Sequence, residues 1–319
     1  MEGVFLAAAA VIVTYNSEDV VEACLEAIAE MAPGVAAVVV DNASTDRTLE
    51  LVRERAEVQV IANSENRGFA AAANQGFRAT GADAVLLLNP DVRLKTPITA
   101  LTDACTQHGL SAGQLNDPSG RPQAGFTIRR FPTPAALALE LLGVNRLWQR
   151  NPINRRYRYQ ERDLSLRGPV EQPAGAFLMA RRDVWERLGG FDEDFHPVWF
   201  EDVDFCRRAI QAGYRIEYVP EVQAEHTGGH SVGKLGATRR ELYWYGSLLR
   251  YAVKHFGPLE YRGVCLAAML GSLPRMVAGM IRERSARPVV SWFKIIRLTG
   301  RRLVSRPGAP GFRAQHINH

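Results

Sequence analysis

The sequence predicts an α/β protein with a mostly parallel central sheet flanked by helices. Four strand-like runs alternate with three helix-like segments in the first hundred residues, the order of repeated strand–helix units. Polar residues directly follow several of the strand-like runs, where such a sheet places its binding crevice. About half of the 319 residues are apolar, enough to pack a core on both faces of the sheet.

The alternation can be followed element by element. Apolar, β-branched runs predict strands at residues 7–14, 35–40, 58–62 and 84–88. Apolar residues three or four positions apart predict helices at about 20–32, 44–55 and 69–80. Pro33-Gly34 and Gly81 lie where the first and third helices should end, and Ser44 or Asp46 can cap the second.

The second half of the chain is less regular. Residues 115–170 are rich in Pro, Arg and Asn and predict long loops around one short helix, the kind of segment that often covers a site. Further patterns predict a strand at 174–180, helices at 182–188 and 201–213, and a strand at 216–220. From about residue 238 the chain is predicted to be helical, aromatic and basic up to residue 306.

Cysteine spacing and hydropathy limit the possible classes. The four cysteines are far apart, which argues against a zinc site or a disulfide framework and favours a reducing compartment. The longest apolar stretch, 264–281, contains Pro274 and Arg275 and is predicted to be a poor membrane span.

The charge is unevenly distributed. The net charge is +5, but residues 239–306 contain fourteen Lys or Arg and three acids, whereas the first 238 residues are net acidic. This asymmetry predicts an anionic partner such as a membrane surface or a polyphosphate, and we expect no nucleic-acid partner.

Two motifs could bind a nucleotide. Asp41 directly follows Val38-Val39-Val40, so its carboxylate could accept hydrogen bonds from a base or a ribose, although capping of the next helix explains it equally well. Asn66-Arg67-Gly68 opens a helix of small residues whose backbone N–H groups could face a phosphate. A tight turn before a closely packed alanine helix is the simpler explanation of the second motif.

Two further motifs could hold a metal ion. Asp91 ends a strand in Asn89-Pro90-Asp91, and a carboxylate beside a diphosphate suits Mg²⁺, although this tripeptide also makes an ordinary turn. His226 precedes Gly228-Gly229, which would allow a ligand to approach closely, but a lone histidine is more often structural.

The most informative stretch is Trp199-Phe200-Glu201-Asp202-Val203-Asp204. Three carboxylates lie in the first turn of a predicted helix, and the helix dipole accounts for some of this acidity. Mutual repulsion and burial beside the two aromatics would raise a pKa, as in a general base. We therefore favour a catalytic role for this stretch over helix capping.

Taken in order, these motifs resemble the family-2 glycosyltransferases of the GT-A fold, particularly the branch of rhamnosyltransferases and galactofuranosyltransferases. The resemblance covers about residues 5–235 and is carried by Val11-Ile12-Val13-Thr14-Tyr15-Asn16, Val40-Asp41-Asn42-Ala43-Ser44-Thr45-Asp46, Asn66-Arg67-Gly68-Phe69-Ala70, Leu88-Asn89-Pro90-Asp91, Gly175-Ala176-Phe177-Leu178, Arg181-Arg182, Gly190-Phe191-Asp192, Phe200-Glu201-Asp202-Val203-Asp204 and His226 with Gly228-Gly229.

The resemblance implies a role for each matching residue. Seven residues would bind the donor: Thr14, Tyr15, Asn16, Asp41, Asn66, Gly68 and Asn89. Asp91 takes the last position of the family's DxD metal motif, with Asn89 in the first, and His226 matches its metal-ligand histidine. Asp202 matches the catalytic base, beside Glu201. The acceptor would be bound by Gly175, Ala176, Trp199 and Phe200.

The implied reaction is an inverting transfer that uses Mg²⁺ or Mn²⁺. The donor would be a dTDP- or UDP-linked sugar, with rhamnose first, and the acceptor a glycan or polyprenyl-linked hydroxyl in cell-envelope polysaccharide synthesis. We expect a catalytic domain at 1–237 (donor half about 1–114, acceptor half about 115–237), a basic helical region at 238–306 and a disordered tail at 307–319. The enzyme would be cytoplasmic and peripheral on the inner face of the membrane.

The basic region itself points toward a membrane. Its apolar residues are interleaved with Arg and Lys, as in a helix that lies in a membrane interface: Trp244, Tyr245, Leu248, Leu249, Tyr251, Phe256, Trp292, Phe293, Ile295 and Ile296. A helical cap on the catalytic domain or a dimer surface are the alternatives, and we favour the membrane slightly.

Two rival functions remain to be weighed. A nucleotidyltransferase usually has a Gly-rich loop with Arg and Lys after the first strand, where this chain has Thr14-Tyr15-Asn16. A non-catalytic nucleotide-sugar-binding protein or membrane scaffold would not need the Glu201-Asp202 pair and His226.

Overall fold

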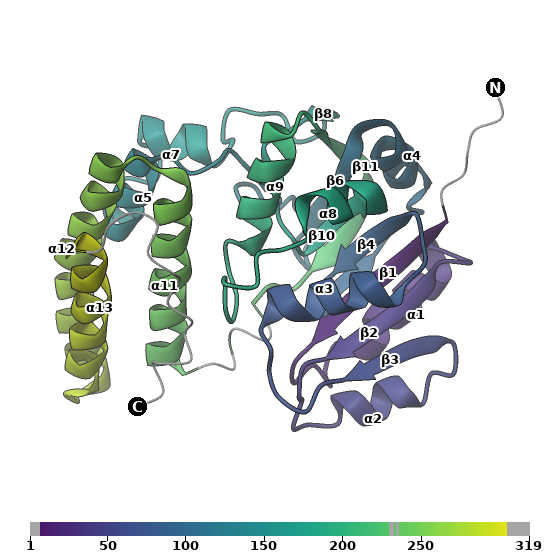
Figure 1. Ribbon diagram of the computed structural model, residues 1–319, viewed down its shortest axis with the longest axis horizontal. Helices are drawn as coiled ribbons and strands as arrows, with labels where there is room; N and C mark the ends of the chain where they lie inside the picture. Colours follow the sequence, from purple (N-terminus) through teal and green to yellow (C-terminus); the bar gives the residue numbers. More distant parts are fainter. Residues whose placement is uncertain (1–6, 230–232, 234–235, 305–319) are drawn as a thin grey trace. The chain divides into compact units, whose positions relative to one another are not determined.

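The computed structural model describes residues 7–229, 233 and 236–304, and the chain forms two compact units (Figure 1). The first, called here the sheet unit, comprises Met1–Phe131, Glu161–Glu193 and Glu201–Lys234. The second, the helical unit, comprises Pro132–Gln160, Asp194–Phe200 and Leu235–His319. The predicted tail at 307–319 lies outside the described residues.

The sheet unit contains eleven described strands. They are β1 (Ala8–Thr14), β2 (Ala36–Asp41), β3 (Val58–Ala62), β4 (Ala84–Leu88), β5 (Val92–Leu94), β6 (Gly109–Asn116), β7 (Ile128–Arg129), β8 (Gly168–Pro169), β9 (Gln172–Pro173), β10 (Phe177–Arg181) and β11 (Arg215–His226). Nine of them form the main sheet, in the order β3-β2-β1-β4-β10-β6-β11-β5 with β8 paired to β11, while β7 and β9 pair separately.

The first four strands are parallel, as the sequence predicts. Beyond them the sheet is mixed, because β10 enters between β4 and β6 and runs antiparallel to both. The apolar pattern of β10 resembles that of its neighbours, since burial on both faces leaves no trace of strand direction in the sequence. The parallel part is therefore the half of the sheet that contains β1 to β4.

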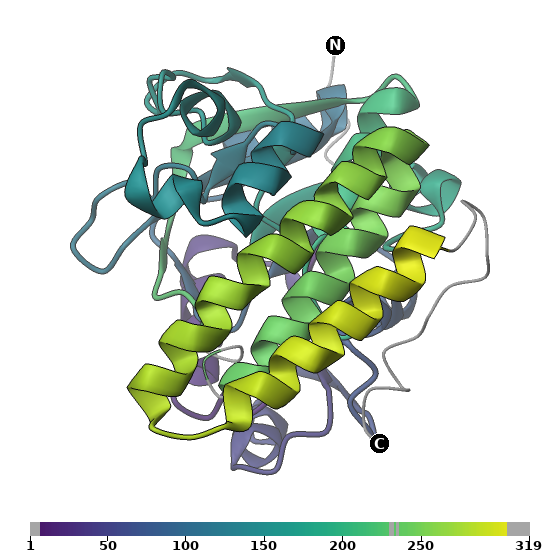
Figure 2. The ribbon, with the colours of Figure 1, turned by 90° about the vertical axis from the view of Figure 1, so that its left-hand side faces the viewer.

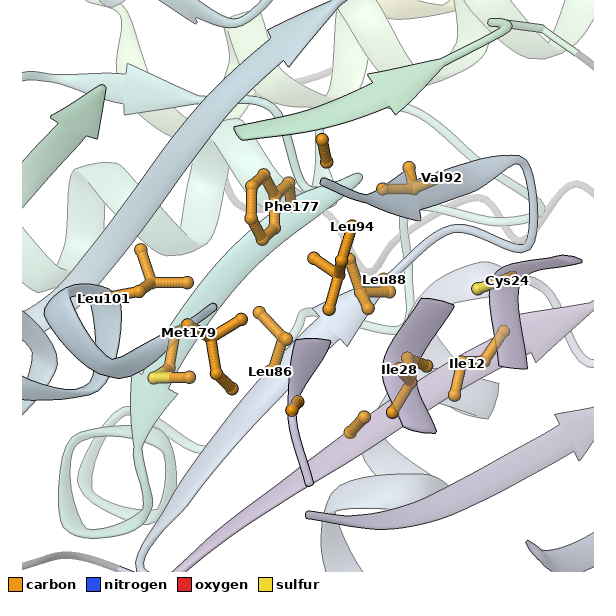
Figure 3. Close-up of a cluster of buried hydrophobic side chains, with 14 of the residues drawn as sticks. Ile12, Cys24, Ile28, Leu86, Leu88, Val92, Leu94, Leu101, Phe177 and Met179 are labelled. Atoms are coloured by element: carbon orange, nitrogen blue, oxygen red, sulfur yellow. The ribbon is translucent and has the colours of Figure 1, made fainter. Parts of the chain in front are cut away.

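Helices cover both faces of this sheet. In the sheet unit they are α1 (Val21–Met31), α2 (Thr48–Arg53), α3 (Phe69–Ala79), α4 (Thr99–His108), α8 (Arg182–Leu188) and α9 (Glu201–Gln211). Ile28 of α1 and Leu101 of α4 pack with Ile12, Leu86 and Leu88 in one buried cluster (Figure 3). These contacts place α1 and α4 on the same face.

The small-residue helix α3 covers the opposite face. A Cβ at Gly76 would collide with the side chain of Val11, so glycine allows the helix to approach β1 closely. The ring of the next residue, Phe77, stacks on Trp185 of α8 with centroids 3.5 Å apart. This close packing brings the start of α3 next to the strand ends.

The helical unit is built from α5 (Pro134–Leu141), α6 (Val144–Leu147), α7 (Pro152–Tyr157), α11 (Ala237–His255), α12 (Pro258–Glu283) and α13 (Arg287–Val304). Figure 2 shows α11, α12 and α13 side by side. The prediction of one helix between 115 and 170 is wrong. Asn151 caps α7 through the N–H of Asn154, ahead of Pro152, a start signal that the prediction overlooked.

Half of the ten aromatic and aliphatic residues predicted to face a membrane are buried in the protein. The buried ones are Tyr245, Leu248, Leu249, Tyr251 and Ile295, whereas Phe293 is exposed. A sequence in which basic and apolar residues alternate does not show whether the apolar side of the helix faces a membrane or a neighbouring helix.

One described helix, α12, is long and apolar enough to cross a membrane by length and composition. We expected its apolar stretch to be a poor span, because Pro274 and Arg275 interrupt it. Core helices of soluble proteins meet the same criterion, so length and composition alone leave the role of α12 open.

Candidate active site

The polar residues predicted to bind the donor lie along one edge of the parallel strands. Thr14 ends β1 and is paired in register with Asp41 at the end of β2. Asn89 follows β4, which pairs with the other side of β1. Because parallel strands present their carboxyl ends at the same edge, the sheet brings these residues to one side of the unit.

The carboxylate of Asp41 is buried and accepts three hydrogen bonds. Its Oδ1 accepts hydrogen bonds from Thr14 Oγ1 at 2.9 Å and Ser44 Oγ at 2.6 Å, and its Oδ2 accepts one from the Ser44 N–H at 3.0 Å. Asp41 therefore holds the β2–α2 turn against β1. Its predicted contact with a base would use the remaining lone pair on Oδ2, and that role stays a prediction.

The residues after β1 are held by the same turn. Asn16 adopts a left-handed conformation with φ 51°, and its side-chain oxygen accepts a hydrogen bond from the N–H of Thr45 at 2.7 Å. Its own N–H donates to Ser44 Oγ at 2.8 Å. Tyr15 donates its N–H to Ser17 Oγ at 3.3 Å. These bonds fix the backbone on which Tyr15 and Asn16 would meet a nucleotide.

The Asn66–Gly68 turn is tied to β2 by amide contacts. The side-chain oxygen of Asn66 accepts hydrogen bonds from Asn42 Nδ2 and from the Gly68 N–H, both at 2.9 Å. Gly68 has φ 83° and ψ 160°, a conformation that only glycine adopts easily. Its N–H is thus used within the turn, which supports the tight-turn explanation. The helix α3 begins without a side-chain cap, which leaves its first N–H groups for a phosphate.

Asp91 and His226 come together although 135 positions separate them in the sequence. The strand β11 runs antiparallel to β5 and pairs His226 with Val92, the residue after Asp91. His226 Nε2 lies 3.6 Å from Asp91 Oδ1, and both side chains are almost completely buried. Two ligands about 2.1 Å from one metal ion lie roughly 3–4 Å apart, so this spacing fits a shared divalent cation.

Gln123 holds the imidazole of His226 in the form that a metal requires. Gln123 Nε2 donates to the His226 carbonyl at 2.7 Å, which turns its Oε1 toward His226 Nδ1 at 2.9 Å. The proton therefore sits on Nδ1, and the lone pair of Nε2 faces Asp91. Burial lowers the pKa of His226, while the charge of Asp91 opposes this shift, so burial favours the neutral imidazole. Phe126 stacks on the ring at 5.0 Å.

The described residues contain no group of three or more His, Cys, Asp or Glu side chains that could hold a metal ion. Asp91 and His226 would provide only two ligands. Mg²⁺ and Mn²⁺ sites of nucleotide enzymes often take one or two protein ligands and complete their coordination with phosphate oxygens and water. The donor set therefore fits a cation that binds together with a diphosphate.

Asp202 is clamped by the backbone at the start of α9. Its Oδ2 accepts the Gly175 N–H and its Oδ1 accepts the Val203 N–H, both at 2.8 Å. A Cβ at Gly175 would lie 2.9 Å from Asp202 Cβ, so the approach requires glycine. Burial raises the pKa of Asp202, and these hydrogen bonds and the charge of Arg129 partly offset the increase.

Glu201 and Asp204, the two acidic neighbours of Asp202, differ from it in their contacts. Burial raises the pKa of Glu201 well above its ordinary value, and the charge of Asp202 raises it further. Among the described residues, Glu201 Oε2 is a buried oxygen without a hydrogen-bond partner. Asp204, in contrast, is fully buried and accepts a hydrogen bond from Arg208 Nε at 2.8 Å in an ion pair. Asp204 therefore stabilises α9, whereas Glu201 and Asp202 are buried carboxyls with raised pKa values, and their catalytic role stays a prediction.

Gly175 and Ala176 contact other site residues, although we predicted that they bind the acceptor. Gly175 contacts Asp202, and the Ala176 carbonyl accepts the Asn89 N–H at 3.1 Å. Two adjacent residues before β10 thus connect the turn of Asp91 with the candidate base. Trp199 and Phe200 belong to the helical unit and have left-handed backbones, with φ 79° and φ 70°. An acceptor role for these four residues stays a prediction.

Sequence reasoning missed three residues of this region: Gln123, Phe126 and Arg129. All three lie after β6, in the stretch that the sequence had marked only as a long loop, and Arg129 is the last residue of β7. Nothing in their local pattern distinguishes them. Their positions depend on Thr127, whose side-chain oxygen donates to the carbonyls of Leu115 and Gln123 and thereby folds the loop back on β6.

Comparisons with known proteins agree with this geometry. Residues 9–122 match the family model described as glycosyl transferase family 2, and residues 155–296 match that of glycosyl transferase family group 2. The chain is 29% identical over 239 residues to an N-acetylglucosaminyl-diphospho-decaprenol L-rhamnosyltransferase of Mycobacterium tuberculosis (strain ATCC 25618 / H37Rv), covering 70% of this chain and 76% of the relative. It is 25% identical to rhamnosyltransferase WbbL of Escherichia coli (strain K12), covering 69% and 83%.

A solved structure shares the fold. The mannosyltransferase PcManGT from Pyrobaculum calidifontis, in complex with GDP-Man and Mn²⁺, matches with a TM-score of 0.52 and 17% identity, over 94% of this chain and 87% of that one. The fold and the two family models therefore agree that this chain belongs to the family-2 glycosyltransferases of the GT-A fold, and the relatives named above are rhamnosyltransferases.

Proposed function

We propose that the chain transfers L-rhamnose from a dTDP- or UDP-linked donor to a hydroxyl of a lipid-linked or glycan acceptor, with inversion at the anomeric carbon. The relatives named above support the sugar and the acceptor class, since one of them carries a polyprenyl-diphosphate acceptor in its name. The observation that carries the proposal is the clamped carboxylate of Asp202 beside the buried Glu201.

Asp202 acts as the general base. Its carboxylate accepts the proton of the acceptor hydroxyl as the acceptor oxygen bonds to the anomeric carbon and the bond from that carbon to the diphosphate breaks. The raised pKa of Asp202 brings its basicity closer to neutral pH, where a general base is most effective. The N–H groups of Gly175 and Val203 fix its orientation, so the attack comes from one side of the sugar.

Asp91 and His226 would hold a divalent cation, Mg²⁺ or Mn²⁺. When bound, such a cation would offset the negative charge that develops on the departing diphosphate. Asn89 in place of an acid lowers the negative charge at this site, so two protein ligands alone would bind a cation weakly and the donor would strengthen its binding. Gln123 keeps His226 in its ligating tautomer.

The strand ends bind the nucleotide. Asp41, held by Thr14 and Ser44, receives the base or the ribose, and Tyr15 and Asn16 line the pocket beside it. The first N–H groups of α3, after Gly68, face the diphosphate. A lipid-linked acceptor supports the further proposal that the enzyme works in the cytoplasm at the inner face of the membrane.

Turnover with defined donors tests the proposal. Purified full-length protein is incubated with dTDP-rhamnose, UDP-galactose or UDP-glucose, with Mn²⁺ or with a chelator, and with a short-chain polyprenyl-diphosphate saccharide. We expect transfer from the rhamnose donor only with metal, and a product of inverted anomeric configuration by NMR. Thermal stabilisation by the donor without any transfer or donor hydrolysis would instead identify a non-catalytic binding protein.

A further inference from the structure

One side of α12 is apolar over several turns of the helix. Between residues 263 and 281, every exposed position of this helix is apolar. The large side chains on this side, called here the α12 face, are Leu266, Leu270, Leu273, Val277, Met280 and Ile281. They recur every three or four residues and therefore form one continuous stripe. A helix that faces water over this length would alternate such residues with charges.

The opposite side of α12 is packed against the rest of the helical unit. A Cβ at Gly271 would collide with the Leu141 carbonyl of α5, so the two helices are in close contact. Arg275 is the one charged residue between 263 and 281, and it points into the unit. Its guanidinium donates to Tyr245 Oη at 2.6 Å and to the Glu140 carbonyl at 2.8 Å. The α12 face is thus the outer side of a helix already anchored in the protein.

Basic residues flank this apolar stripe. Residues 258–304 contain nine Lys or Arg and two acids. Arg262 precedes the stripe, and Arg282, Arg284 and Arg287 follow it. The acid between them, Glu283, pairs with Arg282 at 3.4 Å. On the adjacent helix, α13, Phe293 is also exposed. Apolar side chains bordered by cations match the two layers of an anionic membrane surface, acyl chains below and phosphates above.

We propose that the α12 face docks into the interface of an anionic lipid bilayer, with the helix lying in the membrane plane. A second copy of the chain is a poorer occupant, because pairing two such surfaces would bring two strongly basic segments together. A membrane-spanning α12 would have to break the bonds of Arg275 and the packing of Gly271 on α5. The inference extends the proposed function, because a protein docked in this way could reach a lipid-linked acceptor.

Vesicle flotation of the full-length protein tests the docking. Vesicles of phosphatidylcholine with 30% phosphatidylglycerol are compared with pure phosphatidylcholine vesicles, without nucleotide sugar or acceptor. We expect flotation with the anionic vesicles, much less with the neutral ones, and release by alkaline carbonate. In the Leu270→Glu/Leu273→Glu double variant, the fraction of protein bound to the vesicles should fall by at least about tenfold, since each leucine side chain buried in the bilayer contributes strongly to binding.

Leu166→Glu is the matched control. Leu166 is a leucine of the sheet unit that is 60% exposed, close to the 66% of Leu270. This variant should float like the natural protein, and all variants should keep the same melting temperature and donor hydrolysis. Four results would overturn the inference: no flotation of the natural protein, equal flotation of the natural protein and the double variant, flotation that resists carbonate, or a dimer of the natural protein that dissociates in the double variant. A protein that floats but transfers no sugar would contradict the proposed function instead.

Discussion

The two ends of the candidate site use their carboxylates differently. At the nucleotide end, Asp41 accepts three hydrogen bonds from Thr14 and Ser44, which the fold itself supplies. At the transfer end, Asp202 accepts one backbone N–H on each oxygen, and the buried Glu201 has an oxygen without a partner. Asp41 holds a turn of the fold. Glu201 and Asp202, in contrast, keep lone pairs that the fold does not use, and their raised pKa values would suit the acceptance of a substrate proton.

The same contrast appears within α9. Asp202 and Asp204 are two positions apart, but only Asp204 forms an ion pair, with Arg208. Arg208 also donates to the carbonyls of Leu188 and Gly190, so this pair ties α9 to the end of α8. An acidic cluster in a sequence can therefore contain one carboxylate that stabilises the fold and another that remains available to a substrate. Only their hydrogen-bond and ion-pair partners distinguish the two.

The sharpest way to test this contrast is to neutralise each aspartate of α9. Asp202→Asn should lower kcat by about 10²–10⁴-fold, because the general base is lost, while the amide oxygen can still accept one of the two backbone N–H groups. Donor binding, measured by calorimetry, should remain. Normal turnover by this variant would remove Asp202 from the reaction.

Asp204→Asn is the matched control for that variant. It should lower the free energy of unfolding by about 3 kcal/mol, because Arg208 loses its buried partner. At a temperature where the variant is folded, its kcat should stay within about tenfold of the natural value. A larger loss of kcat than in Asp202→Asn would reverse the two assignments.

The next largest effect concerns the metal ligands. Asp91→Asn should weaken Mn²⁺ binding in the presence of a nucleoside diphosphate by at least about 100-fold, since even outer-shell changes cost 10–100-fold. Binding of the nucleoside without phosphates should not change, because Asp41 and Thr14 lie at the other end of the site. Titration calorimetry measures both affinities. Unchanged Mn²⁺ affinity would show that the cation binds elsewhere.

A smaller effect is expected from the residue behind His226. Gln123→Leu should weaken Mn²⁺ binding by about 10–100-fold, because His226 loses the acceptor that fixes its proton on Nδ1. Gln123→Glu keeps an acceptor for Nδ1 but loses the bond to the His226 carbonyl, so it should bind Mn²⁺ more tightly than Gln123→Leu and less tightly than the natural protein. If both variants bind Mn²⁺ equally, tautomer control by Gln123 is excluded.

The smallest effect is a pH dependence of stability. The pKa of Glu201 in the folded state is raised well above the ordinary glutamate value of 4.5. As the pH rises above 4.5, the folded protein therefore keeps a proton that the unfolded chain loses. Stability is therefore lost as the pH rises through this window, by about 1.4 kcal/mol per unit of pKa difference. Glu201→Gln should equal the natural protein near pH 4 and exceed it increasingly toward pH 8. Urea denaturation at several pH values measures this, and a constant difference would contradict the shift.

The sequence predicted the parallel half of the sheet well because its signals are local. The run 84–88 coincides with β4, and the helix prediction at 182–188 coincides with α8. Short apolar runs closed by Asn, Asp or Gly encode such elements within a few residues. The motif residues at the strand ends were found for the same reason, since topology alone places them at one edge.

What the sequence could not show depends on distant contacts. The antiparallel pairing of β10 and the contact of Gln123 with His226 join segments that are far apart in the chain. The ion pair of Asp204 is local, but the sequence does not show which acid of the cluster forms it. Ten aromatic and aliphatic residues of the basic region were predicted to face a membrane, but half of them are buried in the protein. A stripe such as the α12 face becomes visible only when the buried side of the helix is known.

A crystal structure of the full chain with Mn²⁺ and dTDP or UDP would decide whether the distant motifs form one transfer site. We predict an anomalous peak about 2.2 Å from both Asp91 Oδ1 and His226 Nε2, with diphosphate oxygens completing the coordination and Asp202 facing the open side. Mn²⁺ bound away from Asp91 and His226, or a diphosphate far from the carboxyl ends of β1, β2 and β4, would contradict the proposed mechanism.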